Sequence, residues 1–221
     1  HYFGVGGYRR PVADAWLAEP RFASECLAFG VPPEPGSPDA TATDLTTLLA
    51  RTPRDAGADW DFVDICEYYA RAIYGADVER LRREDPARHG LVCRAAAGET
   101  MSRVQAIWRR PEAVCRGALV WFLRDFWPSA GWGLEGADGS PKSSWFHLKR
   151  CWQPRALMFL DRGLNGLRVL VTNDAGEPLS GRLSVSLERF DGVAVASGEL
   201  ALSVPARSVR EVAVEQVVGS F

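Results

Sequence analysis

The spacing of hydrophobic residues over the first 153 positions is mostly that of helices. Within residues 61–83 hydrophobic side chains recur every three or four positions, which predicts an amphipathic helical region. Gly75 is expected to divide this region into two helices, because glycine commonly ends a helix. Further helices are predicted over residues 12–18, 42–51, 87–109 and 143–152.

Two hydrophobic segments lie between these helices and are predicted to be β-strands. Residues 21–25 are short and end in a carboxylate. Residues 117–123 are continuously hydrophobic, which is typical of a strand buried on both faces in a parallel sheet or barrel. The order of strand, helices, strand and helix has too few strands to close a (β/α)8 barrel. This part is therefore either a small open α/β unit or the last part of a larger barrel.

The pattern changes after Pro154, where hydrophobic and polar residues begin to alternate. Strands are predicted over residues 167–171, 183–187 and 209–217, with turns at 173–176 and 191–192. This predicts a small antiparallel β-sandwich of the immunoglobulin-like kind. The fold class is thus α/β followed by all-β, with an α/β domain over residues 1–153 and a β-sandwich over residues 154–221.

Composition limits the classes of function. The chain has 221 residues, of which 47% are hydrophobic and 24% charged, and these are ordinary values for a globular protein. A net charge of −2 gives no reason to expect nucleic acid or an anionic membrane as a partner. No hydrophobic run is long enough for a membrane span, and the opening residues lack the basic and hydrophobic leader of a signal peptide.

The cysteines and tryptophans suggest no cofactor. The five cysteines show no metal-binding spacing and are expected to be reduced, which favours a cytoplasmic location. No metal or organic cofactor is expected. The eight tryptophans are many for this length, and their flat faces can bind sugars, although core packing accounts for most of them.

Glu25 is the first candidate for chemistry. It lies at the end of a predicted strand, which is where barrel enzymes present their catalytic groups. The alternative is a glutamate on a helix face that pairs with Arg21 four residues earlier. Residues 21–25 by themselves leave both interpretations open.

Three segments together resemble glycoside hydrolase family 2. The sequence RFASE at residues 21–25, followed by a proline-containing loop, resembles the nucleophile segment of that family. Residues 117–132, GALVWFLRDFWPSAGW, resemble its last barrel strand and the loop after it. Residues 138–142, DGSPK, resemble the segment that follows. The His-Tyr pair at the start of the chain is similar to the β-mannosidase branch, and the resemblance extends over essentially the whole chain.

The resemblance implies roles for particular residues. Glu25 matches the catalytic nucleophile, and Trp121 matches the tryptophan that forms the floor of the sugar subsite. Other matched positions, expected to bind substrate, are His1, Tyr2, Asp125 and Trp127. The chain departs from the family at residues 26–27, where Cys-Leu replaces Phe-Gly, and at Phe122 and Arg124, which replace Gln and Asn.

The family's acid/base residue has no counterpart in this sequence. A retaining glycosidase uses two carboxyl groups about 5 Å apart, and in this family the second one follows an asparagine. No Asn-Glu pair occurs in the chain. The resemblance therefore implies that the chain is the C-terminal part of a (β/α)8 barrel plus a β-sandwich, and that the acid/base glutamate lies upstream, in the N-terminal remainder of the same enzyme.

The expected activity is hydrolysis of terminal β-mannosidic bonds with retention, on a β-linked mannoside or oligosaccharide. The fragment alone is expected to be inactive. Two alternatives remain open at this point. One is another exo-β-glycosidase of the same family, of the β-galactosidase or β-glucuronidase type. The other is a carbohydrate-binding module without catalysis.

Overall fold

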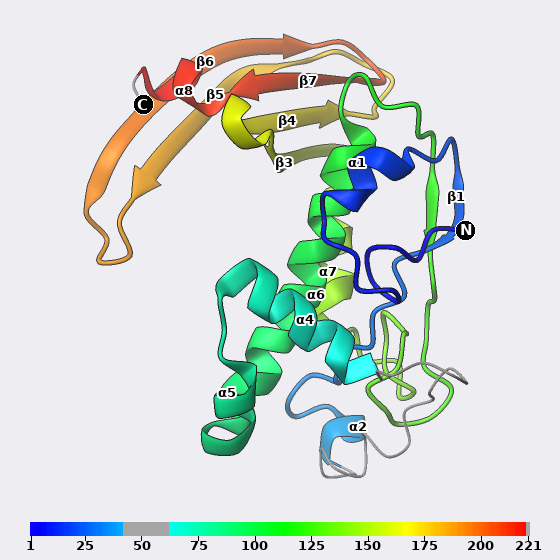
Figure 1. The fold of residues 1–221 in the computed structure, drawn as a ribbon. Helices are drawn as coiled ribbons and strands as arrows, with labels where there is room; N and C mark the ends of the chain where they lie inside the picture. The colour runs from blue at the N-terminus through cyan, green and yellow to red at the C-terminus, as the bar shows by residue number, and fades with distance from the viewer. Residues whose placement is uncertain (42–61, 220–221) are drawn as a thin grey trace. The chain divides into compact units, whose positions relative to one another are not determined.

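The computed structural model describes residues 1–41 and 62–219, and the predicted helix over residues 42–51 lies outside them (Figure 1). The chain divides into two compact units, which are described separately. Unit 1 comprises His1–Val104 and Val114–Lys149, and unit 2 comprises Gln105–Ala113 and Arg150–Phe221. The predicted domain boundary between residues 153 and 154 stays a prediction.

The helices that begin in unit 1 follow the predicted pattern except for the short α2, which was not predicted. They are α1 (Asp14–Ala18), α2 (Pro38–Thr41), α4 (Phe62–Tyr74), α5 (Val78–Glu84), α6 (Pro86–Arg109) and α7 (Ser143–Cys151). Gly75 follows α4 with a φ of +61°, a conformation that glycine adopts readily, and this confirms the predicted break. Asp77 then caps α5 by accepting a hydrogen bond from the Arg80 amide at 3.0 Å. Among the described residues, no helix has the length and hydrophobicity needed to cross a membrane.

The two predicted strands of unit 1 pair in parallel. Strand β1 (Ala23–Cys26) pairs with β2 (Ala118–Val120), and on its other side Tyr2 forms an isolated parallel bridge with Cys26. The Tyr2 amide donates to the Glu25 carbonyl at 2.8 Å. Three segments that are far apart in the sequence thus run in the same direction, with β1 in the middle.

Strand β2 is shorter and more exposed than the sequence predicted. The hydrophobic run at residues 117–123 was expected to be a strand buried on both faces, and this prediction is wrong. Only three residues are in the strand, and Leu119 and Leu123 are 58% and 63% exposed. A hydrophobic run shows only that its side chains favour burial. Whether they are buried depends on which other segments pack against the strand. The described part of the chain puts a strand, β1, along one edge of β2 and none along the other.

Tyr69 of α4 attaches the glycine-rich opening segment to the core of unit 1. Its hydroxyl accepts a hydrogen bond from the Gly6 amide and donates one to the Arg10 carbonyl, both at 2.7 Å. Gly6 has a φ of +103°, and a Cβ there would lie 3.0 Å from the ring of Phe29. Gly6 therefore allows a tight turn of this segment against the core.

Unit 2 contains two antiparallel sheets. One has the order β3 (Arg155–Asp161), β4 (Leu167–Asn173), β7 (Ser208–Ala213), and the other is the hairpin of β5 (Leu179–Glu188) and β6 (Ala194–Val204). A 3₁₀ turn (Gly163–Asn165) links β3 to β4. The buried residues of both sheets and of α8 (Val214–Val218) form one hydrophobic cluster: Val169, Val171, Leu183, Leu202, Val204, Val212 and Val217. Antiparallel strands are confirmed here, whereas the immunoglobulin-like topology stays a prediction.

The strand predicted over residues 209–217 is correct only as far as Ala213. Helix α8 follows, and it brings Val217 into the core. Val214 and Val217 are three residues apart, a spacing that also suits one face of a helical turn, so the short pattern could not separate the two structures. Helix α8 lies so close to β6 that a Cβ on Gly198 would be 1.8 Å from the Val217 carbonyl oxygen.

Ion pairs join the segment after α6, strand β7 and helix α8 to two arginines of unit 2, Arg162 and Arg168. Arg162 contacts Glu112 at 2.5 Å and also pairs with Glu211. Arg168 contacts Glu215 of α8 at 2.7 Å and Glu211 at 3.7 Å. Burial would raise the pKa of the Glu112 carboxyl, but a backbone hydrogen bond and Arg162 outweigh this and lower it.

Glu67 links three helices in unit 1. This α4 side chain is only 1% exposed, and its carboxylate contacts His89 Nε2 of α6 at 2.7 Å and Arg82 Nε of α5 at 3.0 Å. Burial alone would raise the pKa of Glu67, but the hydrogen bonds with His89 and Arg82 outweigh it and lower that pKa below its ordinary value of 4.5. The carboxylate is therefore ionised when the helices are packed.

We expect Glu67→Gln to lower the free energy of unfolding by about 1.5–3 kcal/mol at neutral pH, the usual range for a hydrogen bond to a charged group. Because the folded-state pKa is lowered, this contribution is complete above pH 4.5 and is lost as the pH falls through the folded-state value. Chemical denaturation of the full-length protein at several pH values measures it. Glu84→Gln, at an exposed position on α5, is the matched control. A wild-type advantage that stayed constant down to about pH 3 would contradict the assignment.

Candidate functional site

The candidate site is built on the carboxyl end of β1. Glu25 is the third residue of this strand, and its side chain is 36% exposed. Its carboxylate oxygen Oε2 lies 2.7 Å from Nδ1 of His1, whose side chain is 66% exposed. The sequence-based alternative, a glutamate on a helix face, is excluded because Glu25 is in a strand. The structure therefore offers a solvent-accessible carboxylate with a histidine beside it.

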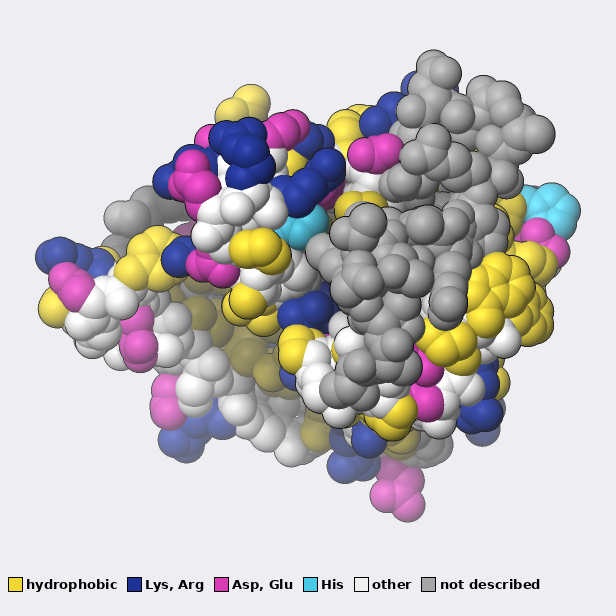
Figure 2. Space-filling model, turned by 90° about the horizontal axis from the view of Figure 1, so that it is seen from below, with side chains coloured by type: hydrophobic (Ala, Val, Ile, Leu, Met, Phe, Trp, Pro, Cys, Tyr) yellow, Lys and Arg dark blue, Asp and Glu magenta, His cyan; other side chains and the backbone are white. Residues whose placement is uncertain are grey.

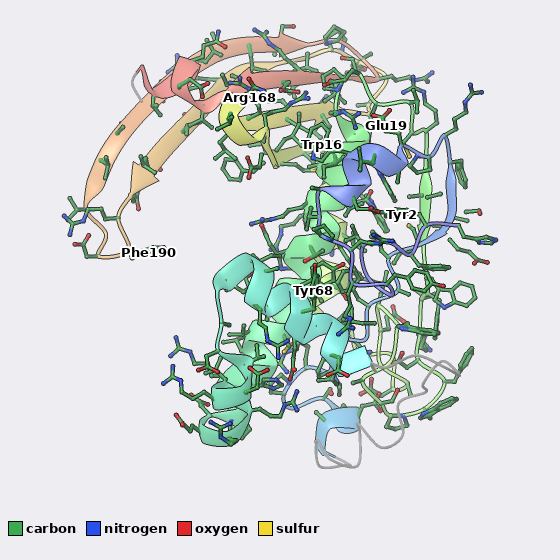
Figure 3. The ribbon with its side chains drawn as sticks, viewed as in Figure 1. Tyr2, Trp16, Glu19, Tyr68, Arg168 and Phe190 are labelled. Carbon is green, nitrogen blue, oxygen red and sulfur yellow. The ribbon has the colours of Figure 1, made fainter. Side chains whose placement is uncertain are left out.

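Tyr2 is next to the same strand, but its hydroxyl is directed to another partner. The hydroxyl donates to Asp14 Oδ2 of α1 at 2.9 Å (Figure 3). Burial, and then the adjacent carboxylate of Asp14, raise the pKa of the Tyr2 phenol above its ordinary value of 10.0. Tyr2 is thus a neutral group whose backbone is fixed to β1 and whose ring is fixed to α1.

The parallel pairing places Trp121 next to Cys26, the residue that follows Glu25. Its amide donates to the Cys26 carbonyl at 2.9 Å, immediately after β2 ends. The side chain is 38% exposed, and its ring meets that of Phe122 edge to face at a centroid distance of 5.7 Å. The carboxyl ends of neighbouring parallel strands lie at one edge of a sheet, so Glu25, His1 and Trp121 are gathered at the same edge.

Asp125 occupies a buried position. Its carboxylate forms an ion pair with Lys142, and the two side chains are only 2% and 1% exposed. The other carboxylate oxygen, Oδ1, accepts a hydrogen bond from the Gly133 amide at 2.7 Å, and Lys142 also donates to the Gly131 carbonyl at 3.1 Å. Burial raises the pKa of Asp125 and lowers that of Lys142, because both charged forms lose hydration. Asp125 therefore shapes the loop after β2, and its contact with substrate stays a prediction.

Trp127 is in the same loop and is 43% exposed. Its neighbour Phe126 is 81% exposed, and the two ring centroids are 6.2 Å apart. The predicted roles of Glu25, Trp121, His1, Tyr2 and Trp127 in catalysis or binding are untested and stay predictions. The first three meet at one edge, Tyr2 joins them through its backbone, and Trp127 follows in the adjoining loop.

Sequence reasoning missed two residues of this region. Lys142 was noted only as part of a motif, whereas the structure makes it the partner of Asp125. The sequence did contain a signal for this pair, because Asp125 and Lys142 lie in two segments that both resemble the same family. Phe126 was passed over, although a Phe-Trp pair inside a loop has no helix or strand pattern to explain it. Among the described residues, no group of three or more His, Cys, Asp or Glu could hold a metal ion.

Comparison with known proteins supports the resemblance found in the sequence. No family model matches the chain. The β-mannosidase B of Thermothelomyces thermophilus is 33% identical over 101 residues, which are 42% of this chain and 12% of that protein. The β-mannosidase B of Aspergillus clavatus is 32% identical over 101 residues, covering 44% and 12%. The chain thus spans about 12% of the length of these curated relatives.

Solved structures show a similar fold over most of the chain. The β-D-mannosidase of Dictyoglomus thermophilum has a TM-score of 0.64 and 19% identity, covering 96% of this chain and 25% of that one. The exo-chitosanase of Amycolatopsis orientalis has a TM-score of 0.65 and 20% identity, covering 90% and 24%. The partial match to β-mannosidase B and the likeness of fold confirm that this chain resembles a portion of the family 2 glycosidases. Because the sequence identities are only 19% and 20%, the solved structures show a likeness of fold alone.

We expect Lys142→Met to destabilise unit 1 by about 3–5 kcal/mol, because it leaves the buried carboxylate of Asp125 without a counter-charge. The double variant Lys142→Met with Asp125→Asn should recover part of this loss. Arg124→Gln is the control, since Arg124 pairs with Glu135 at 2.9 Å and is 56% exposed, and such a pair contributes about 0–1 kcal/mol. Denaturant unfolding of the full-length variants measures all three. Equal losses for Lys142→Met and Arg124→Gln would refute a special role for the buried pair.

Proposed function

We propose that the complete polypeptide containing this chain is a retaining exo-β-glycosidase that removes terminal β-linked mannose. The observation that carries the proposal is the position of Glu25 at the carboxyl end of β1, with His1 on its carboxylate and Trp121 on the neighbouring strand. The partial identity to β-mannosidase B supports the sugar preference.

The proposed reaction has two displacements. The Glu25 carboxylate attacks the anomeric carbon, forms a bond to it, and the bond from that carbon to the leaving oxygen breaks. A second glutamate upstream of His1 gives its proton to the leaving oxygen. The same glutamate then takes a proton from water, which attacks the anomeric carbon and releases Glu25. No metal or redox partner enters either step.

The described side chains suit this reaction. His1 lies 2.7 Å from the Glu25 carboxylate and orients it. Trp121 offers a partly exposed ring as the floor for the sugar. The neutral hydroxyl of Tyr2 holds α1 close to the site through Asp14.

The rest of the enzyme is part of the proposal. Three parallel segments around β1 are compatible with the last part of a (β/α)8 barrel, whose earlier strands and acid/base glutamate would precede His1. We propose that unit 2 is a β-sandwich attached to that barrel. All five cysteines are free, which supports a reducing, cytoplasmic location.

The test uses the longest natural polypeptide that contains this chain, assayed on a β-mannoside. We expect Glu25→Ala to lower kcat by on the order of 10⁴-fold or more, as when other covalent nucleophiles are removed. Glu84→Gln, an exposed acid on α5, is the matched control and should keep wild-type activity. A mechanism-based fluorosugar should add its mass to the wild-type enzyme on the peptide that contains Glu25.

Other outcomes separate the alternatives. Near-normal turnover by Glu25→Ala would overturn its role as nucleophile. Hydrolysis of a β-galactoside, β-glucuronide or β-glucosaminide in preference to the β-mannoside would keep the mechanism and replace the sugar. Binding of sugars without cleavage by the complete wild-type protein would replace the enzyme with a carbohydrate-binding module.

A further inference from the structure

Two segments of unit 1 continue from the strands of the candidate site. The segment after β1, residues 27–41, begins two positions after Glu25 and ends in α2. The loop after β2, residues 121–142, contains Trp121 and Trp127. The relative position of the two segments therefore affects how both tryptophans lie with respect to the Glu25 carboxylate.

The backbones of the two segments are joined at Gly131. Its carbonyl accepts a hydrogen bond from the Val31 amide at 3.0 Å and another from Nζ of Lys142 at 3.1 Å. Val31 and Lys142 are both buried, so water does not compete for this contact. The buried ion pair of Asp125 and Lys142 is thereby connected to the segment that follows Glu25.

Asp39 makes a second attachment between the two segments. This α2 residue is only 5% exposed, and its Oδ2 accepts hydrogen bonds from the amide of Ala137 at 2.6 Å and from that of Asp138 at 3.4 Å. Hydrogen bonds to an ionised acceptor are stronger than those to a neutral oxygen. Asp39 therefore fixes the turn at residues 136–139 against α2.

Glu34 makes a third attachment. Its Oε1 accepts a hydrogen bond at 2.6 Å from the amide of Ser143, the first residue of α7, and its Oε2 lies 3.3 Å from Nε of Arg94 in α6. The Ser143 hydroxyl donates to the Arg94 carbonyl at 2.9 Å. Because Lys142 directly precedes Ser143, Glu34 holds the end of the loop after β2.

Both acids act over a long distance in the sequence. The amides that they bind are 98 positions from Asp39 and 109 positions from Glu34. An ordinary helix cap instead binds an amide two or three residues further along, as Asp77 does at the start of α5. The two carboxylates thus connect distant segments of the chain, in addition to any effect on a single helix.

We propose that Asp39 and Glu34 are positioning residues for the reaction. They hold the loop after β2 against the segment after β1, and this contact fixes both tryptophans relative to Glu25. The inference rests on the proposed function, and neither acid takes part in a chemical step of that reaction. A displacement of about 1 Å in an active site can slow a reaction on the order of 10²-fold, so such contacts affect turnover from a distance.

The kinetic test uses the full-length enzyme and a nitrophenyl β-mannoside. We expect Asp39→Ala to lower kcat per titrated site by on the order of 10²-fold, with a smaller change in KM, because the sugar and Glu25 are no longer aligned. Sites are counted with the mechanism-based fluorosugar, so unfolded protein does not enter kcat. Asp39→Asn keeps an acceptor oxygen and should recover most of the loss. Glu34→Ala, at a position 32% exposed, should also lower kcat and tests the same contact if Asp39→Ala does not fold.

Asp77→Ala is the matched control. Asp77 also accepts a hydrogen bond from a backbone amide, that of Arg80, but both residues belong to one helix. Basic and acidic side chains are interspersed over the face shown in Figure 2, so removal of one surface charge is a small electrostatic change. Its kcat per titrated site should equal that of the wild type. An equal loss in Asp77→Ala, or wild-type kcat in every folded alanine variant of Asp39 and Glu34, would overturn the inference.

Hydrogen–deuterium exchange separates this inference from the proposed function, because it needs no turnover. In Asp39→Ala and Glu34→Ala, peptides from residues 27–41 and 121–142 should both exchange faster than in the wild type, since each segment loses an attachment to the other. Asp77→Ala should leave both unchanged. Unchanged exchange in the two alanine variants would overturn the attachment even in an active enzyme. Faster exchange in both segments supports the attachment even if the wild-type protein cleaves no mannoside, in which case the activity assay refutes the proposed function and not the contact.

Discussion

Parallel hydrogen bonding on both sides of β1 is the constraint on which the candidate site depends. The Tyr2 amide bonds to the Glu25 carbonyl on one side, and the Trp121 amide bonds to the Cys26 carbonyl on the other. This register brings His1, Glu25 and Trp121, which lie in three separate segments of the sequence, to one edge of the sheet. The backbone therefore brings the carboxylate, the histidine and the tryptophan to one edge of the sheet.

Buried polar groups then fix the segments around this edge. The Tyr69 hydroxyl bonds to both Gly6 and Arg10 and so holds the opening segment, while Asp125 and Lys142 hold the loop after β2. Each such group costs free energy when it loses water, and it is tolerated only where a partner of matching geometry is present. These contacts consequently specify one arrangement of loops, which is what a site built from loops and strand ends requires.

Different interactions stabilise the two units. In unit 1, Glu67 ties α4, α5 and α6 together through a buried, ionised carboxylate. Unit 2 has a hydrophobic cluster shared by its two sheets and α8, and ion pairs of Arg162 and Arg168 bind its outer elements. The end of α6 lies in the second unit, so one continuous helix takes part in both.

The sequence by itself determined the local elements and the place of Glu25. Helices α4, α5 and α6 follow from periodicity and Gly75, because these signals act within a few residues. The family motifs located the strand end that carries the carboxylate. The tertiary structure alone decided that Lys142 neutralises Asp125, that β2 is exposed, and that α8 replaces the end of a predicted strand. Partner choice and burial depend on which distant segments meet, and no local pattern contains that information.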